Sequence, residues 1–430
     1  MEFTIAPGVF DILPNDKKDP WRSSYLWHFV EGVMRNTAHS YGFHEIRTPT
    51  FERTELFKRG VGEETDIVGK EMYTFEDRGG RSMTLRPEGT AAAMRALIES
   101  QLLQETPVQK IYYIAPMFRY ERNQAGRYRQ HHQFGVEAVG NGAPEQDVEA
   151  IDLIFTIFNR LGLKGLQVTL NSIGDPESRA NYRAALVAYL KEHYEKLSPD
   201  SKVRLEKNPL RVLDSKDPGD KEINLHAPSV LDFLNGESRD HFEQVQRLLK
   251  ELKIPFKIDH NLVRGLDYYN KTVFEVVAGE LGAQNSIMGG GRYDGLLKLL
   301  GGPDLPAFGF GAGIERVLHT LLKQNAPHPE PYKPELFLIT LGDAAKVAGF
   351  KVIHELRQAG IPAQMDFSGR KVGKLMQAAD QMGARHTAVL GDNELQNQRI
   401  ELKRLSSGEK VELPLTQLAE HLQKDFVPHV

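Results

Sequence analysis

The sequence predicts an α+β domain with an antiparallel sheet and helices, a helical insertion, and a separate carboxyl-terminal α/β domain. In the first 324 residues, strand patterns meet at hairpin turns and show no repeated βαβ pattern, which favours antiparallel pairing. Residues of about 175–260 are charged and helix-prone, which indicates an inserted helical subdomain. The stretch 325–334 holds four prolines, which mark a linker. We therefore expect domains at 1–324 and 335–430.

Composition narrows the class of protein. The chain has 430 residues, 40% of them hydrophobic, with a net charge of −4 and no cysteine. The absence of cysteine excludes disulfides, thiolate zinc sites and cysteine nucleophiles. No window approaches the roughly 18 consecutive apolar residues of a membrane helix, and no basic segment precedes an apolar one at the start, so we expect a cytoplasmic protein without a membrane partner. A nucleic-acid partner would have to bind local basic clusters.

The first elements follow from apolar spacing and turn residues. Apolar residues at helical spacing predict a helix within 20–42. A hairpin is expected over 72–85, around a glycine-rich turn. A helix over 91–97 follows, with Thr90 as its expected cap. Glu88 should then lie just outside the start of that helix.

The stretch from Met117 to Glu137 predicts two strands joined by a basic loop. Side chains alternate in a strand, so one face would carry Met117, Arg119 and Glu121, followed on the return strand by His131, Gln133, Gly135 and Glu137. Arginine offers a planar fork to phosphate or carboxylate, and glutamate accepts hydrogen bonds from amines or ring N–H groups. This face suits a ligand that is anionic at one end and cationic or hydrogen-bonding at the other. A solvated hairpin with alternating charges fits the same residues.

Three later stretches carry further candidates, in a region of strand character over about 262–313 that a short helix over 293–300 interrupts. Leu262–Tyr269 places an arginine and two tyrosines in an expected strand, where simple aromatic packing is an equally good interpretation. Three adjacent glycines, Gly289, Gly290 and Gly291, permit close backbone approach and are expected to interrupt the strands. In Phe308–Arg316, alternate glycines form a flat strip for a planar base ahead of a helix from about 314. Arg316 would reach a phosphate or remain a surface charge.

The carboxyl-terminal domain shows an α/β pattern. Its expected elements are strands at 336–340, 363–367 and 387–390, helices at 344–359 and 373–382, a hairpin near 406–409, and a terminal helix from Thr416.

Four of these pieces, in order along the chain, resemble the histidyl-tRNA synthetase family of class II aminoacyl-tRNA synthetases. Arg119-x-Glu121 and Gly313–Arg316 look like class II motifs 2 and 3, whereas Arg264–Tyr269 and Gly289–Gly295 look like the two signatures peculiar to the histidine enzymes. The resemblance covers essentially the whole chain. It implies a histidine–tRNA ligase that activates L-histidine with ATP to histidyl-adenylate and pyrophosphate, and then transfers histidine to the 3′ end of tRNA(His).

Further segments extend the resemblance. Residues 45–52 are similar to motif 1, which implies a homodimer, and the carboxyl-terminal α/β unit is similar to the anticodon-binding domain of class IIa enzymes. The family uses fixed arginines and Mg²⁺ to stabilise charge on the α-phosphate, with no covalent protein intermediate. We therefore expect no dedicated protein cage for the metal.

The resemblance also implies roles for individual residues. Arg264 and Arg119 would act on the α-phosphate during catalysis. Histidine would be bound by Glu88, Thr90, Gln133, Glu137, Arg264, Tyr268, Tyr269 and Tyr293. ATP would be bound by Arg119, Glu121, Arg129, His131 and Arg316. The acceptor end of tRNA would approach Arg122 and Gln124.

One position departs from the family pattern. His131 stands where the family usually has a phenylalanine that stacks on adenine. Imidazole is planar but offers less apolar area, and free histidine titrates near neutral pH. We expect ATP binding to be retained, with some sensitivity to pH.

Two other functions use related features. Synthetase-like regulatory subunits of ATP phosphoribosyltransferase usually lack the anticodon domain and lose several signature residues, and both are present here. A non-catalytic sensor of histidine or uncharged tRNA would not need Arg119, Arg264 and Arg316 together. The residues therefore favour the enzyme.

Overall fold

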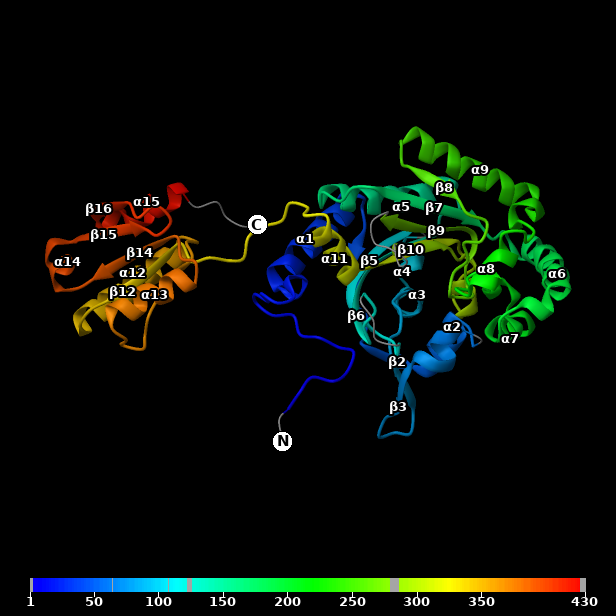
Figure 1. Ribbon diagram of the computed structural model, residues 1–430, viewed down its shortest axis with the longest axis horizontal. Helices are drawn as coiled ribbons and strands as arrows, with labels where there is room; N and C mark the ends of the chain where they lie inside the picture. The colour runs from blue at the N-terminus through cyan, green and yellow to red at the C-terminus, as the bar shows by residue number, and fades with distance from the viewer. Residues whose placement is uncertain (1–2, 64, 107, 122–125, 279–285, 426–430) are drawn as a thin grey trace. The chain divides into compact units, whose positions relative to one another are not determined.

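The computed structural model describes residues 3–63, 65–106, 108–121, 126–278 and 286–425 (Figure 1). The chain divides into two compact units, Met1–Pro329 and Glu330–Val430. Among the described residues, none of the helices has the length and apolar character needed to span a bilayer.

A sheet of eight strands organises the first unit. Most neighbouring strands are antiparallel, as the hairpin pattern predicts, and parallel pairs occur between β1 and β5 and between β7 and β8. The strand order is β1 (His44–Glu45), β5 (Gln109–Phe118), β6 (Gln130–Val139), β11 (Ala307–Gly313), β10 (Ser286–Arg292), β9 (Asn270–Ala278), β7 (Leu166–Ser172) and β8 (Phe256–Ile258).

Helices cover one face of this sheet (Figure 1). The covering helices are α1 (Ser24–Ser40), α5 (Pro144–Arg160), α9 (Gly236–Glu251) and α11 (Ile314–Lys323). Their apolar stripes bury residues such as Val30, Ile154 and Val317 in one core with Phe134 and Val136 of β6. Because side chains alternate along β6, Gln133 and Glu137 belong to the opposite face.

Smaller elements surround that opposite face. α3 (Thr90–Glu99) and α10 (Leu296–Leu299) pack on part of it through a second core that includes Met94, Leu97 and Leu297. A three-stranded sheet of β2 (Phe51–Arg53), β4 (Ser82–Leu85) and β3 (Tyr73–Glu76) contains the expected hairpin. The remaining short elements are η1 (Pro20–Arg22), α2 (Thr54–Val61), η2 (Ile67–Glu71) and α4 (Leu102–Glu105).

The insertion is helical and has its own core. It contains α6 (Pro176–Glu192), η3 (Tyr194–Lys196), α7 (Pro199–Lys207), η4 (Pro209–Val212), α8 (Pro218–Asn224) and η5 (Val230–Phe233) and is followed by α9. α6, α7 and α8 each begin with a proline after an Asp or Ser whose side chain accepts a backbone hydrogen bond. Its core includes Tyr182, Leu186, Leu190 and Val212.

Several local expectations are wrong. Thr90 does not cap α3, because the Glu88 carboxylate accepts from the first backbone amides of that helix. β5 ends at Phe118, so Arg119 and Glu121 follow the strand. Gly289 and its two successors lie inside β10 and do not interrupt the sheet.

Leu262–Tyr269 is also not a strand. Its carbonyl groups bind side chains of the insertion instead of a neighbouring strand. Arg211 donates to the Gly265 carbonyl at 2.6 Å, and Arg179 donates to the Tyr269 carbonyl. Sequence periodicity does not reveal such long-range partners. We call this segment the arginine loop.

The second unit is a separate α/β fold. Its sheet has the order β13 (Ala363–Met365), β12 (Leu336–Thr340), β14 (His386–Leu390), β15 (Arg399–Arg404) and β16 (Lys410–Pro414). The helices are α12 (Asp343–Gln358), α13 (Val372–Gln381), α14 (Asp392–Asn397), η7 (Leu415–Gln417) and α15 (Leu418–Asp425). The short helix α14 was not expected from the sequence.

Candidate active site

The face of the large sheet opposite α1, α5, α9 and α11 carries a cavity of about 310 Å³. β6, β10 and β11 form its floor, and the arginine loop and the segment after β5 form walls. Charged groups dominate the lining. The predicted site residues that line it are Glu88, Thr90, Arg119, Glu121, His131, Gln133, Arg264, Tyr268, Tyr269 and Arg316.

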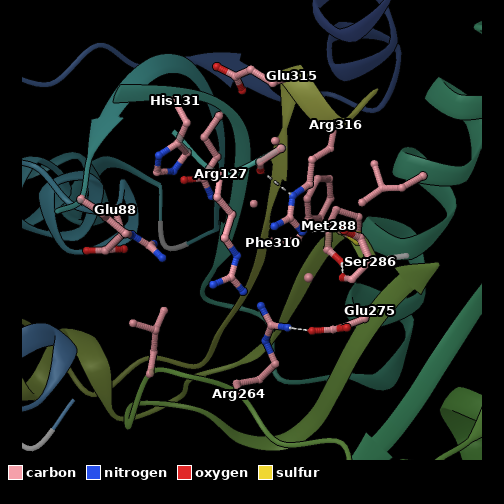
Figure 2. A pocket seen from close by; sticks show the side chains of 18 of the residues that line it. Glu88, Arg127, His131, Arg264, Glu275, Ser286, Met288, Phe310, Glu315 and Arg316 are labelled. Carbon is pink, nitrogen blue, oxygen red and sulfur yellow. Dashed lines mark hydrogen bonds and ion pairs between the residues drawn. The ribbon is translucent and has the colours of Figure 1, made fainter. Parts of the chain in front are cut away.

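Guanidinium groups gather at one end. Figure 2 shows Arg127, Arg264 and Arg316 extending into the cavity from three different segments. Arg316 is held by the Gly126 carbonyl at 3.2 Å and the Ser286 carbonyl at 2.6 Å. Burial and the nearby positive charge of Arg127 lower the pKa of Arg316. An anion with several oxygens would relieve this repulsion between fixed cations.

Arg119 and Arg264 complete the cationic lining. Arg119 donates to the Pro87 carbonyl at 2.7 Å, which fixes it beside the start of α3. Arg264 pairs with Glu275 of β9 and lies over the Tyr269 ring at 5.8 Å. Glu275 therefore orients the Arg264 side chain and leaves its buried Nε without a hydrogen-bond acceptor.

Carboxyl and hydroxyl groups gather near the start of α3. Glu88 accepts from the Thr90 amide at 2.7 Å, and Thr90 in turn donates its hydroxyl proton to Glu137 at 2.8 Å. Glu137 also accepts from the hydroxyl groups of Tyr113 and Tyr293. Burial raises the pKa of Glu88, and it raises the pKa of Glu137 to about 8. This part of the site can bind a cationic or hydrogen-donating group.

Glycines make room for the polar side chains of the floor. A Cβ at Gly311 would lie 1.4 Å from Gln133 Nε2, and a Cβ at Gly309 would lie 2.2 Å from Glu137 Oε2. The sequence argument assigned these alternate glycines to a planar base. Their closest neighbours are instead side chains of the site, although Gly311 also lines the cavity.

Other predicted residues lie elsewhere. Glu137 and Tyr293 do not line the cavity and lie beneath it, where they are hydrogen-bonded to each other. Arg129 does not line it either, because its side chain lies over the Tyr120 ring at 4.1 Å and reaches the Pro7 carbonyl at 3.4 Å. Arg122 and Gln124 lie outside the described residues.

The structure also adds residues that we did not assign from the sequence. Arg127 lies in the recognised basic loop, but spacing alone did not distinguish it from Arg129. It pairs with Glu121 at 3.4 Å and lines the cavity. Glu275 stands between apolar residues in β9, and nothing in its local pattern links it to Arg264.

His131 lines the cavity but does not behave as the sequence suggests. Burial, together with the positive charge of Arg119, lowers the pKa of His131 to about 3. The expectation that it titrates near neutral pH in the free protein is therefore wrong. The side chain presents a neutral ring between pH 6 and pH 8.

Metal-binding groups are sparse in the described part of the chain. No cluster of three or more His, Cys, Asp or Glu residues there has the geometry to hold a metal ion. Glu121 and Glu275 nevertheless line the same cavity as the four arginines. Mg²⁺ commonly uses one or two carboxylates together with substrate phosphates and water. These residues fit an ion carried in by a polyphosphate.

Sequence comparison now assigns the chain to a family. Residues 20–317 match the family described as histidyl-tRNA synthetase, and residues 335–425 match an anticodon binding domain. The chain belongs to the histidyl-tRNA synthetase family. A histidine–tRNA ligase of Protochlamydia amoebophila is 62% identical over 423 residues, which cover 98% of this chain and 100% of the relative. One from Bacillus velezensis is 47% identical, with 99% of each chain covered.

Solved structures show the same histidyl-tRNA synthetase fold. The apo histidyl-tRNA synthetase of S. aureus has a TM-score of 0.82 at 40% identity and covers 98% of this chain and 100% of its own. A Bacillus halodurans protein described as an ATP phosphoribosyltransferase regulatory subunit/histidyl-tRNA synthetase has a TM-score of 0.66 at 22% identity, covering 91% of this chain and 99% of its own. The latter likeness concerns the fold alone. The full-length relatives support the ligase over the regulatory subunit.

Proposed function

We propose that this family member is an active histidine–tRNA ligase. It uses ATP to convert L-histidine to histidyl-adenylate and pyrophosphate, and it then passes histidine to the 3′ end of tRNA(His). The observation that carries the proposal is one cavity lined by the guanidinium groups of Arg127, Arg264 and Arg316 and, near the start of α3, by the Glu88 carboxyl with Arg119 beside it. That charge separation matches a polyphosphate at one end and a cationic amino group at the other.

In the first step, the histidine carboxylate attacks the α-phosphate of ATP and pyrophosphate leaves. Arg264 and Arg119 stabilise the negative charge on the α-phosphate oxygens. Arg127 and Arg316 bind the departing phosphates, so Arg127 takes the role first expected for Arg129. Because these cations are already fixed by Glu275, Glu121 and backbone carbonyls, little reorganisation accompanies the reaction.

Histidine is held at the other end of the cavity. Glu88, Thr90 and Gln133 bind its amino group and the neighbouring backbone atoms. Tyr268 and Tyr269 face the imidazole, with Glu137 and Tyr293 supporting them from below. An apolar amino acid would leave these buried polar groups without partners, which gives strong discrimination.

Adenine lies beside His131 and Glu121. Mg²⁺, when bound with ATP near Glu121 and Glu275, neutralises charge on the polyphosphate. The tRNA acceptor end approaches Arg122 and Gln124, and the anticodon is bound by residues 335–430 across the linker 325–334. Motif 1, residues 45–52, contributes to a homodimer, and the enzyme acts in the cytoplasm.

A two-stage assay tests the function. The full-length protein should exchange labelled pyrophosphate into ATP only when histidine is present, and it should then charge tRNA(His). Arg264→Ala should lower the exchange rate at least about 100-fold, as expected for the loss of a group that stabilises developing charge. A sensor would bind histidine without exchange, and a regulatory subunit would neither exchange nor charge.

A further inference from the structure

Residues 126–129 lead into β6 and form part of the wall of the active-site cavity. We call them the loop limb. Arg127 and Tyr128 line the cavity, and the Gly126 carbonyl accepts a hydrogen bond from Arg316 at 3.2 Å. Figure 2 shows Arg127 and Arg316 extending into the same space. The position of the loop limb therefore decides where Arg127 lies relative to Arg316.

The guanidinium groups of Arg127 and Arg316 repel each other. After burial, the positive charge of Arg127 is the next cause of the lowered pKa of Arg316. Glu121 offsets part of this charge through its ion pair with Arg127 at 3.4 Å. Like charges at close range favour separation, so other contacts are needed to hold the loop limb against α11 before a polyphosphate binds.

Residues 7–10 supply such contacts, although none of them is among the residues that line the cavity. The Arg129 amide donates to the Gly8 carbonyl at 2.7 Å, and the Arg129 carbonyl accepts from the Arg119 amide at 2.9 Å. The main chain of Arg129 is therefore fixed between residues 7–10 and the segment after β5. Gly8 has a φ of +83°, which favours glycine, and a Cβ there would lie 2.8 Å from Arg129 Cδ.

Phe10 extends this contact into an aromatic cluster. The centroid of its ring lies 4.8 Å from that of Tyr128 and 4.7 Å from that of Trp21, both in edge-to-face geometry. Trp21 stacks on Tyr128 at 5.3 Å. The Tyr128 hydroxyl lies 3.3 Å from His319 Nε2, and His319 follows Arg316 by three residues in α11. The cluster therefore ties the loop limb to the helix that carries Arg316.

We propose that Gly8 and Phe10 are positioning residues of the ATP site. They hold the loop limb against α11, so that Arg127 and Arg316 stay side by side despite their repulsion. The proposal rests on the proposed ligase function, because ATP is the polyphosphate that these two arginines would bind. Two cations held in place in advance reduce the reorganisation that accompanies ATP binding.

The test compares two phenylalanines of the same segment of the chain. Phe10→Ala removes the ring from the cluster, and Phe10→Leu keeps part of its apolar bulk. Phe3→Ala is the matched control, since the Phe3 side chain is 98% exposed. For each protein, the Kd for ATP is measured by equilibrium titration, and the KM values for ATP and histidine are measured in pyrophosphate exchange. Thermal unfolding checks that each variant is folded.

The proposal predicts a selective loss of ATP affinity. Phe10→Ala should raise the Kd and the KM for ATP about tenfold and leave the KM for histidine within about twofold of wild type. Phe10→Leu should fall between these values, and Phe3→Ala should match wild type. Gly8→Ala, which displaces Arg129 and leaves the aromatic cluster unchanged, should raise the same two ATP constants. It provides an independent test if Phe10→Ala does not fold.

A double-mutant cycle with Arg127→Ala distinguishes positioning from a general loss of stability. Once the charge at position 127 is removed, Phe10→Ala should change the Kd for ATP by less than about twofold. Full additivity of the two effects, or an unchanged Kd for ATP in the folded single variants Phe10→Ala and Gly8→Ala, would refute the proposal. The Kd requires no turnover, so this test holds whether or not wild type exchanges pyrophosphate. Absence of histidine-dependent exchange in wild type would refute the ligase function itself.

Discussion

At the scale of single residues, burial decides which groups carry charge. Glu137 is fully buried, and its hydroxyl donors do not offset the loss of water, so its pKa is raised to about 8. A carboxyl whose pKa is higher in the folded protein than in the unfolded chain costs stability as pH rises between those two values. The same residue that supports the histidine pocket therefore weakens the fold at alkaline pH.

Glu137→Gln should show this effect. Glutamine at position 137 does not titrate. The free energy of unfolding of the variant, relative to that of wild type, should therefore rise from about pH 5 to about pH 8, by at most about 1.4 kcal/mol per pH unit. Chemical unfolding of both proteins across this range measures the difference directly. A constant difference would mean that Glu137 titrates alike in the folded and unfolded states.

For His131, in contrast to Glu137, we expect no dependence on pH in the working range. Because its pKa is lowered to about 3, the ring stays neutral over the working range of pH. His131→Phe should lower the KM for ATP a few-fold through greater apolar stacking area, with the same ratio to wild type at every pH between 6 and 8. Exchange kinetics at several pH values test this. If the ratio of the two KM values changes between pH 6 and pH 8, His131 titrates in this range and the expectation of a neutral ring is wrong.

Arg127 and Arg129 illustrate the limit of assignment from sequence. Both are basic residues of one loop, and periodicity does not separate them. Folding directs Arg127 to the cavity and Arg129 to the Tyr120 ring and the Pro7 carbonyl. The Pro7 carbonyl belongs to a segment more than 100 residues earlier in the chain, so no local pattern reveals this contact of Arg129.

A pair of variants separates their roles. Arg127→Ala should raise the KM for ATP at least about tenfold, because it removes a charge-assisted phosphate contact. Arg129→Ala should mainly reduce thermal stability through lost packing over Tyr120. Parallel measurement of KM and Tm distinguishes them, and a larger rise in KM for Arg129→Ala would reverse the assignment.

At the scale of elements, the antiparallel sheet and most of its hairpins were predictable, since alternation and turn residues encode them locally. The arginine loop was not. Its residues have strand character, but their carbonyls bind Arg179 and Arg211 of the insertion. The capping of α3 by Glu88 was missed for a similar reason, because Thr90 fits the local rule while its hydroxyl is used by Glu137.

β11 offers a direct test of the sheet floor. Gly311→Ala should raise the KM for histidine by at least about tenfold, because the new methyl group collides with Gln133 and displaces it. Gly32→Ala in α1 is the matched control, since a Cβ there meets no atom within 4 Å. It should leave kinetics unchanged and stabilise the helix by about 1 kcal/mol. Equal histidine kinetics in the two variants would contradict this description of the floor.

At the scale of the whole molecule, the two units have separate cores and a proline-rich connection. That division was readable from composition, because four prolines interrupt the pattern between two self-sufficient sets of elements. The contact between the insertion and the arginine loop, in contrast, was not predictable. The insertion and the arginine loop are far apart in the sequence, and sequence motifs do not predict a contact between such distant segments.

Separating the units should divide the activity. A fragment of residues 1–329 should retain histidine-dependent exchange, because both ends of the active-site cavity lie within it, but it should charge tRNA(His) at least about tenfold less efficiently. Circular dichroism of each fragment establishes folding first. Full charging efficiency in the shorter fragment would show that residues 335–430 do not contribute to recognition.

The glycines of the floor have a consequence for evolution. Gly289, Gly309 and Gly311 each face a polar side chain at a distance that leaves no space for a methyl group. Every single-nucleotide missense change in a glycine codon adds at least that much, so no small mutational step at these positions is neutral. A saturation mutagenesis library selected for growth should retain only glycine at all three sites. The positions that tolerate no substitution would then follow the shape of the substrate pocket, although these glycines form no chemical bond with the substrate.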